Sequence, residues 1–264
     1  MIIGGWFGKK KRQKDFREEE NSVSGASSAQ LPFRTDLHSH LIPHIDDGAQ
    51  SLKESLDLLQ RLENIGYRRC IITPHVMADS YRNSTERILT ELDKLRKYAE
   101  TFGIKIELHA AAEYYLDEEL LHRLKIGDIL SVGSGYLLFE TSYYASPLNL
   151  EEAIYEIAAS GYRPLLAHPE RYRYVQDPEE FYGRLREQGV SFQVNINSFG
   201  GHYGSDAYRK ARWLSEKGWI DFLGSDLHHR PQADFLHDII NSDVLDSVMK
   251  YNVILNDQLE LSEG

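Results

Sequence analysis

The segment DLHSHLIPHIDDG, residues 36–48, holds three histidines and three aspartates in thirteen positions. It lies where the first buried strand of the chain is expected to end. Side chains two residues apart on a strand point to the same side, so His38 and His40 can bind the same metal ion. The following loop adds Asp46 and Asp47, either of which could be a ligand while the other supports it. The segment therefore predicts a strand that ends at a metal site.

Side chains that can bind metal also follow other apolar runs of the chain. They occur in the segments TPH, AAE, LLFE, LLAH and GSDLH, and they are His75, Glu113, Glu140, His168, Asp226 and His228. Taken singly, each could be a turn residue, a helix cap or a hydrogen-bonded rim residue. Together they indicate one shared site, because the carboxyl ends of all strands of a parallel barrel meet at one mouth. Charged groups inside such a mouth are costly unless they are paired or bind metal.

Amphipathic helix patterns alternate with short apolar segments along the rest of the chain. Residues 51–66, SLKESLDLLQRLENIG, have leucines on one face and stop at Gly66. Residues 83–103 predict a second helix, which opens with Asn83 and Glu86 in capping-box spacing. The next segment, IKIELHAAAEYY, predicts one strand. About seven strands separated by helices predict a parallel sheet with helices outside it. Periodicity permits an open sheet or a closed barrel, and the clustered strand ends favour the barrel.

Composition and charge exclude several classes of protein. The chain has 264 residues, a net charge of −11 and a pI near 5.5, which argues against a nucleic-acid binder with a basic stripe. Cys70 is the single cysteine, so an intrachain disulfide is impossible and a reducing compartment is indicated. No apolar run approaches the roughly 20 residues that span a bilayer, and the expected location is cytoplasmic.

The first part of the chain reads as a tail. Residues 1–30 contain a basic run, an acidic run and a Ser/Gly/Ala-rich stretch, with little to bury. We interpret them as a disordered N-terminal tail, and residues 31–264 as one catalytic barrel domain. An alternative interpretation makes Trp6, Phe7 and the lysines after them a weak contact to a membrane surface or a partner.

The expected ligands are imidazoles and carboxylates, which suit Mn²⁺, Fe or Zn²⁺ and exclude thiolate zinc sites and iron–sulfur clusters. About nine ligands exceed what one ion can use, so two or three divalent metal ions are expected, with Glu113 as a natural bridge. Such a centre activates a hydroxide for attack on phosphorus and therefore fits phosphoester hydrolysis. Arg171 in AHPERY and Arg230 in DLHHRP lie beside expected ligands and could hold the remaining phosphoryl oxygens.

The motifs together resemble those of the PHP (polymerase and histidinol phosphatase) superfamily. DLHSHLIPHIDDGAQS, TPH, AAEYY, LLFE, LLAHPERY, QVNINS and GSDLHH occur in the family order across residues 34 to about 256. More narrowly, the chain resembles the bacterial metal-dependent protein tyrosine phosphatases of the CpsB/YwqE type. The resemblance implies an α/β fold, a distorted TIM-like (β/α)7 barrel of the PHP type, with a trinuclear site that often holds manganese.

The same resemblance implies roles for individual residues. The implied metal ligands are His38, His40, Asp47, His75, Glu113, Glu140, His168, Asp226 and His228. Asp47, Arg171 and Arg230 would belong to the catalytic centre, with Arg171 on the substrate phosphate. The implied substrate is phosphotyrosine in the tail of a cognate bacterial tyrosine kinase that controls capsule or exopolysaccharide synthesis. The segment VMADSYRNS departs from the family pattern because it lacks further histidines, and Arg230 follows SDLHH at a shorter spacing.

Three alternatives to a phosphotyrosine substrate remain open from the sequence. The same site could act on a small phosphomonoester such as histidinol phosphate, or on a nucleic-acid end, which the acidic composition disfavours. The barrel could also bind metal or a phosphoprotein without turnover. A cysteine-dependent tyrosine phosphatase is not indicated, because IITPHV after Cys70 contains no arginine-ended phosphate loop.

Overall fold

The strands of the protein form two sheets with parallel pairing. The computed structural model describes residues 31–133 and 135–260, so the tail expected at residues 1–30 lies outside the described part. One sheet has the order β1-β2-β4 and the other the order β3-β5-β6-β7-β8-β9. Every strand pair in both sheets is parallel. The strands are β1 (Thr35–Asp36), β2 (Arg69–Ile72), β3 (His75–Val76), β4 (Glu107–Ala110), β5 (Glu113–Tyr115), β6 (Tyr136–Glu140), β7 (Arg163–Ala167), β8 (Ser191–Asn195) and β9 (Phe222–Gly224).

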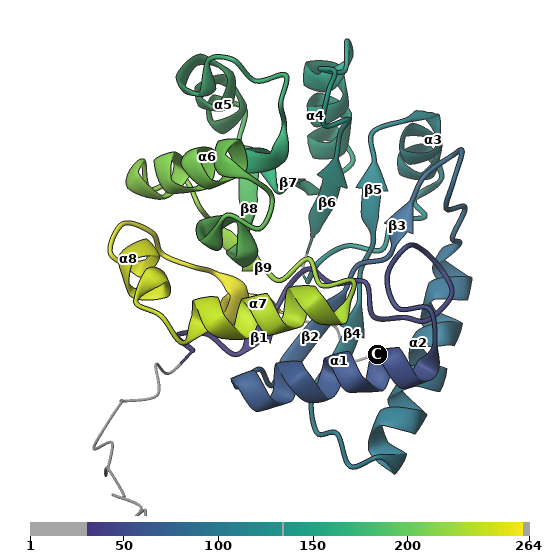
Figure 1. Cartoon of the computed structure of the whole chain (residues 1–264). Helices are drawn as coiled ribbons and strands as arrows, with labels where there is room; N and C mark the ends of the chain where they lie inside the picture. Colours follow the sequence, from purple (N-terminus) through teal and green to yellow (C-terminus); the bar gives the residue numbers. More distant parts are fainter. Residues whose placement is uncertain (1–30, 134, 261–264) are drawn as a thin grey trace, which may run out of the picture.

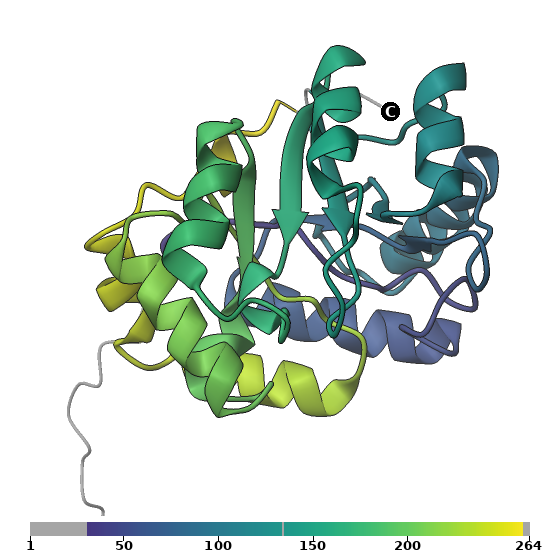
Figure 2. The ribbon, with the colours of Figure 1, turned by 90° about the horizontal axis from the view of Figure 1, so that it is seen from above.

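Helices cover the outside of the sheets, and Figures 1 and 2 show them around the central strands. The α-helices are α1 (Leu52–Ile65), α2 (Thr85–Thr101), α3 (Glu118–Ile126), α4 (Leu150–Ala159), α5 (Pro178–Glu187), α6 (Ser205–Glu216), α7 (Arg230–Ile240) and α8 (Val244–Met249). Three short 3-10 helices are η1 (Pro169–Arg171), η2 (Ile196–Gly200) and η3 (Asn256–Gln258). None of the described helices combines the length and the hydrophobicity that crossing a bilayer requires.

Two stretches of the chain join the two sheets, because each stretch contributes one strand to each sheet. β2 and β3 belong to one stretch, interrupted at Pro74, which has no N–H to donate to a strand ladder. β4 and β5 belong to another, interrupted at Ala111, so the single strand expected for IKIELHAAAEYY is wrong. Hydrogen bonds continue across both interruptions, from Ala111 N to Ile72 O at 2.9 Å and from Glu113 N to Pro74 O at 3.1 Å.

The outer edges of the two sheets meet and close a barrel. A parallel bridge joins Ser39, after β1, to Leu227, after β9. Backbone hydrogen bonds run from His40 N to Leu227 O at 2.9 Å and from Asp226 N to His38 O at 2.7 Å. Because two stretches hold two strands each, the nine described strands make seven segments around the barrel. The expected distorted barrel is confirmed.

Helix α1 shows how the amphipathic pattern produces the outer layer. Leu56, Leu59 and Leu62 are buried against the barrel, and Ser51 caps the first turn by accepting a hydrogen bond from the backbone of Glu54. The helix ends at Gly66, whose φ of 123° lies where side chains with a Cβ are strained. The helix predicted for this segment is therefore confirmed at both ends.

The start of α2 differs from the capping box predicted at Asn83. Ser84 is the N-cap, and its hydroxyl accepts a hydrogen bond from Arg87 N at 3.1 Å. Asn83 is buried instead, and its amide donates to Ile45 O at 2.8 Å and to His75 O at 2.9 Å. Asn83 therefore ties the loop after β1 to strand β3, which positions residues of the mouth.

Helix α7 has no counterpart among the elements that the sequence analysis predicts. Its second residue, Pro231, stands in the first turn, where the missing N–H leaves no hydrogen bond unmade. Gln232 closes the turn by accepting hydrogen bonds from His228 N at 2.8 Å and from His229 N at 3.0 Å. α7 packs beside α1 and fixes the loop that carries Asp226 and His228.

Candidate metal centre

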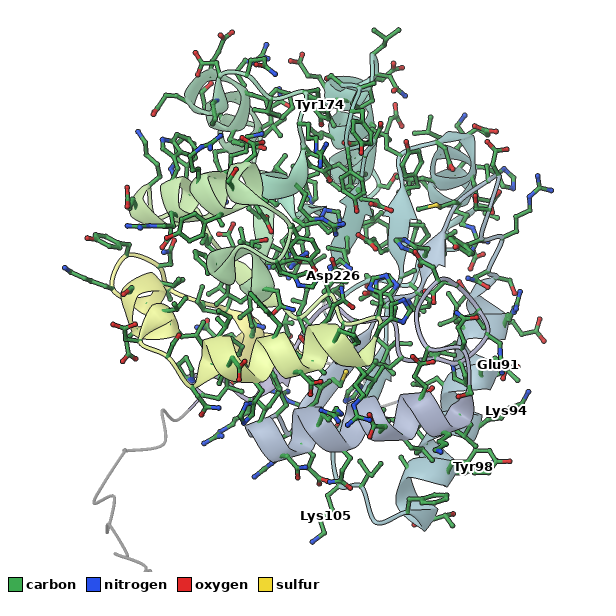
Figure 3. The ribbon with its side chains drawn as sticks, viewed as in Figure 1. Glu91, Lys94, Tyr98, Lys105, Tyr174 and Asp226 are labelled. Atoms are coloured by element: carbon green, nitrogen blue, oxygen red, sulfur yellow. The ribbon has the colours of Figure 1, made fainter. Side chains whose placement is uncertain are left out.

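The mouth of the barrel gathers all nine residues predicted as metal ligands. They lie at or directly after the ends of strand segments and in the loop after β1, and Figure 3 shows Asp226 near the centre of the view. Within each of four overlapping groups, possible ligand atoms lie within 4.8 Å of one another. The groups are His38 with Glu113 and His168; His38 with His40 and Asp226; His75 with Glu113 and Glu140; and His40 with Asp47, His75 and His228.

The His38 and His40 imidazoles are held so that the same nitrogen of each faces inward. His38 Nδ1 lies 2.7 Å from Gln193 Oε1, and His40 Nδ1 lies 2.8 Å from Asp46 Oδ2. Both partners are acceptors, so each Nδ1 donates a hydrogen bond away from the mouth and each Nε2 faces into it. The two Nε2 atoms are 3.2 Å apart, which leaves room for one cation between them, either a proton or a metal ion.

Glu113 lies at the centre of the imidazoles and contacts them with both oxygens. Its Oε1 is 2.9 Å from His168 Nε2, and its Oε2 is 3.2 Å from His38 Nε2 and 3.1 Å from His75 Nδ1. The side chain is buried. A buried carboxylate that belongs to two of the groups is placed as a bridge between neighbouring cations.

Several buried polar atoms at the mouth lack a hydrogen-bond partner among the described residues. They are His75 Nδ1, Glu113 Oε2, Glu140 Oε1 and His168 Nδ1. His75 Nδ1 lies 3.1 Å from Glu113 Oε2 and 3.2 Å from Glu140 Oε1, so three of these atoms converge on one point. Unpaired buried polar groups are rare in native proteins, and convergent ones indicate a missing ligand such as a metal ion.

Asp226 uses one carboxylate oxygen for support and turns the other toward the imidazoles. Oδ2 accepts hydrogen bonds from Arg171 and Asn195, both at 2.7 Å, and from Tyr203 at 3.3 Å. Oδ1 lies 3.6 Å from the Nε2 atoms of His38 and His40. The supporting donors fix the carboxylate plane, so Oδ1 is held ready for a cation.

The structure separates the roles of the two neighbouring aspartates. Asp46 is buried, and its oxygens contact His40 Nδ1, Gly48 N at 3.0 Å and His75 N at 3.2 Å. Asp47 instead turns Oδ1 toward the cavity, 3.4 Å from His75 Nε2 and 3.5 Å from the corresponding nitrogen of His228. Asp47 therefore faces the mouth, and Asp46 holds the His40 imidazole and the backbone of His75.

Backbone strain and close packing also position this centre. His168 and Asp226 have φ values of 33° and 48°, which non-glycine residues adopt at a cost of about 1–3 kcal/mol and which occur mostly at functional sites. Gly48 passes so close to His40 that an added Cβ would lie 2.0 Å from the His40 carbonyl oxygen. The loop carrying Asp47 can reach the mouth only because this position has no side chain.

Opposing effects act on the pKa values at the mouth in the absence of metal. Burial alone would lower the pKa of His38, but Glu113 and Asp226 raise it to about 9. Burial alone would also lower the pKa of His75, but Glu113 and Glu140 raise it to about 10. Protons on these imidazoles thus neutralise the carboxylates, and a metal ion has to displace them.

The two predicted arginines differ in their surroundings. Arg171 Nη1 donates to Asp226 Oδ2, and the guanidinium lies 4.5 Å from the ring centre of Tyr143 and 4.3 Å from that of Tyr203. It lines the cavity above the centre. Arg230 is exposed at the first residue of α7 and is not among the lining residues. Its catalytic role stays a prediction.

A cavity of about 520 Å³ opens over the centre. Its walls above the ligands are rich in tyrosine, and these tyrosines are Tyr81, Tyr115, Tyr143, Tyr144 and Tyr203. Tyr81 stacks on the ring of His75 with an interplanar angle of 14°. The arrangement combines a buried charged floor with aromatic walls, which suits a ligand with an anionic group on an aryl ring.

Sequence reasoning missed the supports that strand β8 provides. Gln193 contacts His38, and its amide donates to Asn195 Oδ1 at 2.9 Å, while Asn195 donates to Asp226. Gln193 and Asn195 are two residues apart on a strand, so the alternation of side chains could have placed both toward the mouth. Tyr143 and Tyr203 lie in loops and left no such signal. Six other histidines are in none of the four groups, namely His44, His109, His122, His202, His229 and His237.

Comparison with known proteins gives a consistent result. The profile of the family described as "Capsular polysaccharide synthesis, CpsB/CapC" matches residues 34–235. The tyrosine-protein phosphatase YwqE of Bacillus subtilis is 28% identical over 201 residues, covering 76% of this chain and 79% of that protein. The tyrosine-protein phosphatase CpsB of Streptococcus pneumoniae is 26% identical over 200 residues, covering 74% of this chain and 82% of that protein.

A solved structure shares the fold. It comes from a study of YwqE from Bacillus subtilis and CpsB from Streptococcus pneumoniae, described as metal-dependent tyrosine phosphatases. The match has a TM-score of 0.73 at 24% identity and covers 87% of this chain and all of that one. The described barrel is therefore the barrel of these relatives.

Proposed function

The chain belongs to the CpsB/CapC family of capsular polysaccharide synthesis proteins, and from this premise we propose that it is a metal-dependent tyrosine-protein phosphatase. The observation that carries the proposal is the pair of inward Nε2 atoms of His38 and His40, 3.2 Å apart and surrounded by carboxylates. Such an arrangement is repulsive without a cation, and the family's named activity supplies a use for one.

The residues at the mouth fit divalent metal ions. We propose as ligands the predicted set of His38, His40, Asp47, His75, Glu113, Glu140, His168, Asp226 and His228, which forms the four groups. The overlap of the groups and the bridging place of Glu113 support two or three ions. Imidazole and carboxylate donors without thiolate suit Mn²⁺ first, with Fe or Zn²⁺ as alternatives. Bound ions of this kind supply Lewis acidity and lower the pKa of water.

The protein's own side chains bind and orient the phosphate group. Arg171 keeps one nitrogen on Asp226 and has further N–H donors for phosphoryl oxygens above the ligands. Tyr143 and Tyr203 lie against its guanidinium, so the donor is fixed in place before substrate binds. The buried ligands surround the reacting group with fixed dipoles in place of bulk water.

The substrate class follows from the family and from the tyrosine-rich cavity. We propose phosphotyrosine in a protein as the substrate, and the capsule link of the family supports a cognate bacterial tyrosine kinase as its source. The aromatic walls accommodate the ring of phosphotyrosine while its phosphate reaches the buried floor. An aliphatic phosphomonoester would use the floor but leave the aromatic walls without contact.

Hydrolysis of a phosphotyrosine peptide, measured together with metal content, tests the proposal. The protein purified with Mn²⁺ should hydrolyse the peptide faster than histidinol phosphate, and EDTA should abolish the activity. His40→Ala should lose both bound metal and activity. His237→Ala, at an exposed position on α7, is the matched control and should lose neither. Activity that survives EDTA, or a His40→Ala variant with full metal content, contradicts the proposal.

A further inference from the structure

A second cavity of about 440 Å³ adjoins the cavity over the metal centre. The two share part of their walls, namely Tyr143, Tyr144, Arg171 and Tyr203. The second cavity adds Arg173 and the residues at the start of α6, from Gly204 to Ala207. A peptide whose phosphotyrosine lies over the metal centre would therefore place neighbouring residues against this second cavity.

Arg171 and Arg173 each lie over the ring of a tyrosine, Arg171 over Tyr143 and Arg173 over Tyr144. The Arg171 guanidinium lies 4.5 Å from the ring centre of Tyr143, and that of Arg173 lies 5.3 Å from the ring centre of Tyr144. A backbone hydrogen bond from Arg173 N to Tyr143 O at 2.8 Å fixes the two segments against each other. The first pair faces the metal centre, and the second faces the adjoining cavity.

Of the charged side chains that line the adjoining cavity, Arg173 is the cation that forms no ion pair with a described carboxylate. Arg171 is paired with Asp226 at 2.7 Å. Asp206, the acidic residue in the wall, is itself paired with Arg209 at 3.0 Å and with Lys210 at 2.9 Å. Among the described residues Arg173 contacts only the face of Tyr144 through its guanidinium, so its N–H groups can bind an added carboxylate.

We propose that Arg173 binds an acidic side chain of the substrate, next to the phosphotyrosine, and so selects phosphotyrosine peptides with a neighbouring Asp or Glu. The inference rests on the proposed phosphatase function. Tyr172, between the two arginines, has extended backbone, so Arg171 and Arg173 are spaced by about 6–7 Å along the wall. An extended peptide covers that distance in two residues, which places the acidic residue within two positions of the phosphotyrosine.

The net charge of the protein makes this local cation important. At −11 the protein repels acidic peptides at long range, so only a short-range contact can produce a preference for them. Arg173 is exposed and can be changed without disturbing the core. Lys105 is also exposed and lies near the lower edge of Figure 3, far from Asp226, so Lys105→Gln removes the same charge at a distant place.

The test compares two phosphotyrosine peptides. One has Glu at the second position before and the second position after the phosphotyrosine, and the other has Gln at both positions. The wild-type protein with Mn²⁺ should show roughly threefold higher kcat/KM for the Glu peptide, mainly through KM. Arg173→Gln should remove the preference, Arg173→Glu should reverse it, and Lys105→Gln should keep it. Binding of the same peptides with a non-hydrolysable phosphonate in place of phosphate should follow the same order.

Hydrolysis of free phosphotyrosine separates this inference from the proposed function. All four proteins should hydrolyse it at similar rates, because it does not reach Arg173. A wild-type protein that hydrolyses free phosphotyrosine but treats both peptides alike overturns the role of Arg173 and leaves the phosphatase intact. An Arg173→Gln variant that retains the preference overturns that role as well. A wild-type protein that hydrolyses no phosphotyrosine overturns the phosphatase function and this inference with it.

Discussion

Asp46 and Asp47 are neighbours in the sequence, yet they act on opposite sides of the same imidazole cluster. Asp46 contacts Nδ1 of His40, which points away from the mouth, whereas Asp47 faces the Nε2 atoms of His75 and His228. The sharp turn at Gly48 makes this possible, because Asp46 accepts the Gly48 N–H and directs Asp47 the other way. One residue is therefore placed to bind a metal ion, and the other to orient a ligand.

The first prediction separates these two roles by substitution. Asp47→Asn should reduce the stoichiometry of bound metal, because it removes a proposed ligand. Asp46→Asn should keep the stoichiometry but weaken affinity by roughly 10–100-fold, because His40 loses its orienting acceptor. Metal titration followed by elemental analysis measures both quantities. The roles are exchanged if Asp46→Asn is the variant that lacks an ion.

The second prediction concerns stability on metal removal. Ions that bind only the folded protein stabilise it, by about 2.7 kcal/mol at a free concentration of 100 Kd. Mn²⁺ should therefore raise the melting temperature of the protein treated with EDTA, and Mg²⁺ should raise it less because Mg²⁺ disfavours imidazole ligands. Differential scanning calorimetry measures the change. An unchanged melting temperature at saturating Mn²⁺ argues against a metal centre among these residues.

The third prediction is that metal affinity rises with pH. The pKa values of His38 and His75 in the metal-free fold are raised to about 9 and about 10. Their protons stabilise the metal-free fold fully below the unfolded value near 6.5, and this stabilisation is lost as the pH rises through 9 and 10. A metal ion displaces these protons, so Mn²⁺ affinity should increase between pH 6.5 and 9.

Calorimetric titration at pH 7 in buffers of different ionisation enthalpy measures the protons released per metal ion. We expect at least one proton per protein. An affinity that is constant across this pH range, with no buffer dependence of the observed heat, would show that the imidazoles are already neutral in the metal-free protein.

The fourth prediction concerns Arg171. Arg171→Lys keeps a positive charge near Asp226 but loses the planar fork, so kcat on phosphotyrosine should fall about 10²–10³-fold with metal content unchanged. Arg230→Gln should have a smaller effect, because Arg230 is exposed outside the cavity lining. Steady-state kinetics with the fully loaded proteins measures both. An equal or larger loss in the Arg230 variant would place that side chain at the substrate when it is bound.

The fifth prediction uses the close approach at Gly48. A Cβ there would lie 2.0 Å from the carbonyl oxygen of His40, so Gly48→Ala must displace the loop or the strand end. We expect a loss of about 1–3 kcal/mol in the free energy of unfolding, together with weaker metal binding. Gly183→Ala on α5, where an added Cβ would lie 3.8 Å from the nearest atom, a ring carbon of Trp219, separates general glycine effects from this contact.

The gathering of the nine expected ligands at one mouth could be predicted from the sequence because a parallel barrel leaves little freedom at its strand ends. Glu140 is the last residue of β6 and His168 directly follows β7, so each reaches the mouth wherever the neighbouring strands lie. The alternation of side chains likewise placed His38 and His40 on one side. The closed barrel followed from the same regularities, whereas the family followed from the resemblance of the motifs.

Other features depended on loop conformations that no periodicity reports. A turn sets the different orientations of Asp46 and Asp47, and the predicted cap at Asn83 was wrong because that amide bonds to His75 O instead. Helix α7 was missed because Arg230 and Pro231 interrupt the apolar pattern just where the helix begins. Arg173 gave no signal by itself, since only the tertiary structure shows that its cavity adjoins the metal centre.

The first and last strands of the barrel are paired at the mouth, and Asp36 and Ser225, 189 residues apart, hydrogen-bond across that junction. His38 and Asp226 extend from the same two strands. A growing or truncated chain that lacks β9 and the loop after it therefore lacks Asp226 and His228, two of the nine proposed ligands. Tight binding of the proposed metal ions would then report that the ring of strands has been completed.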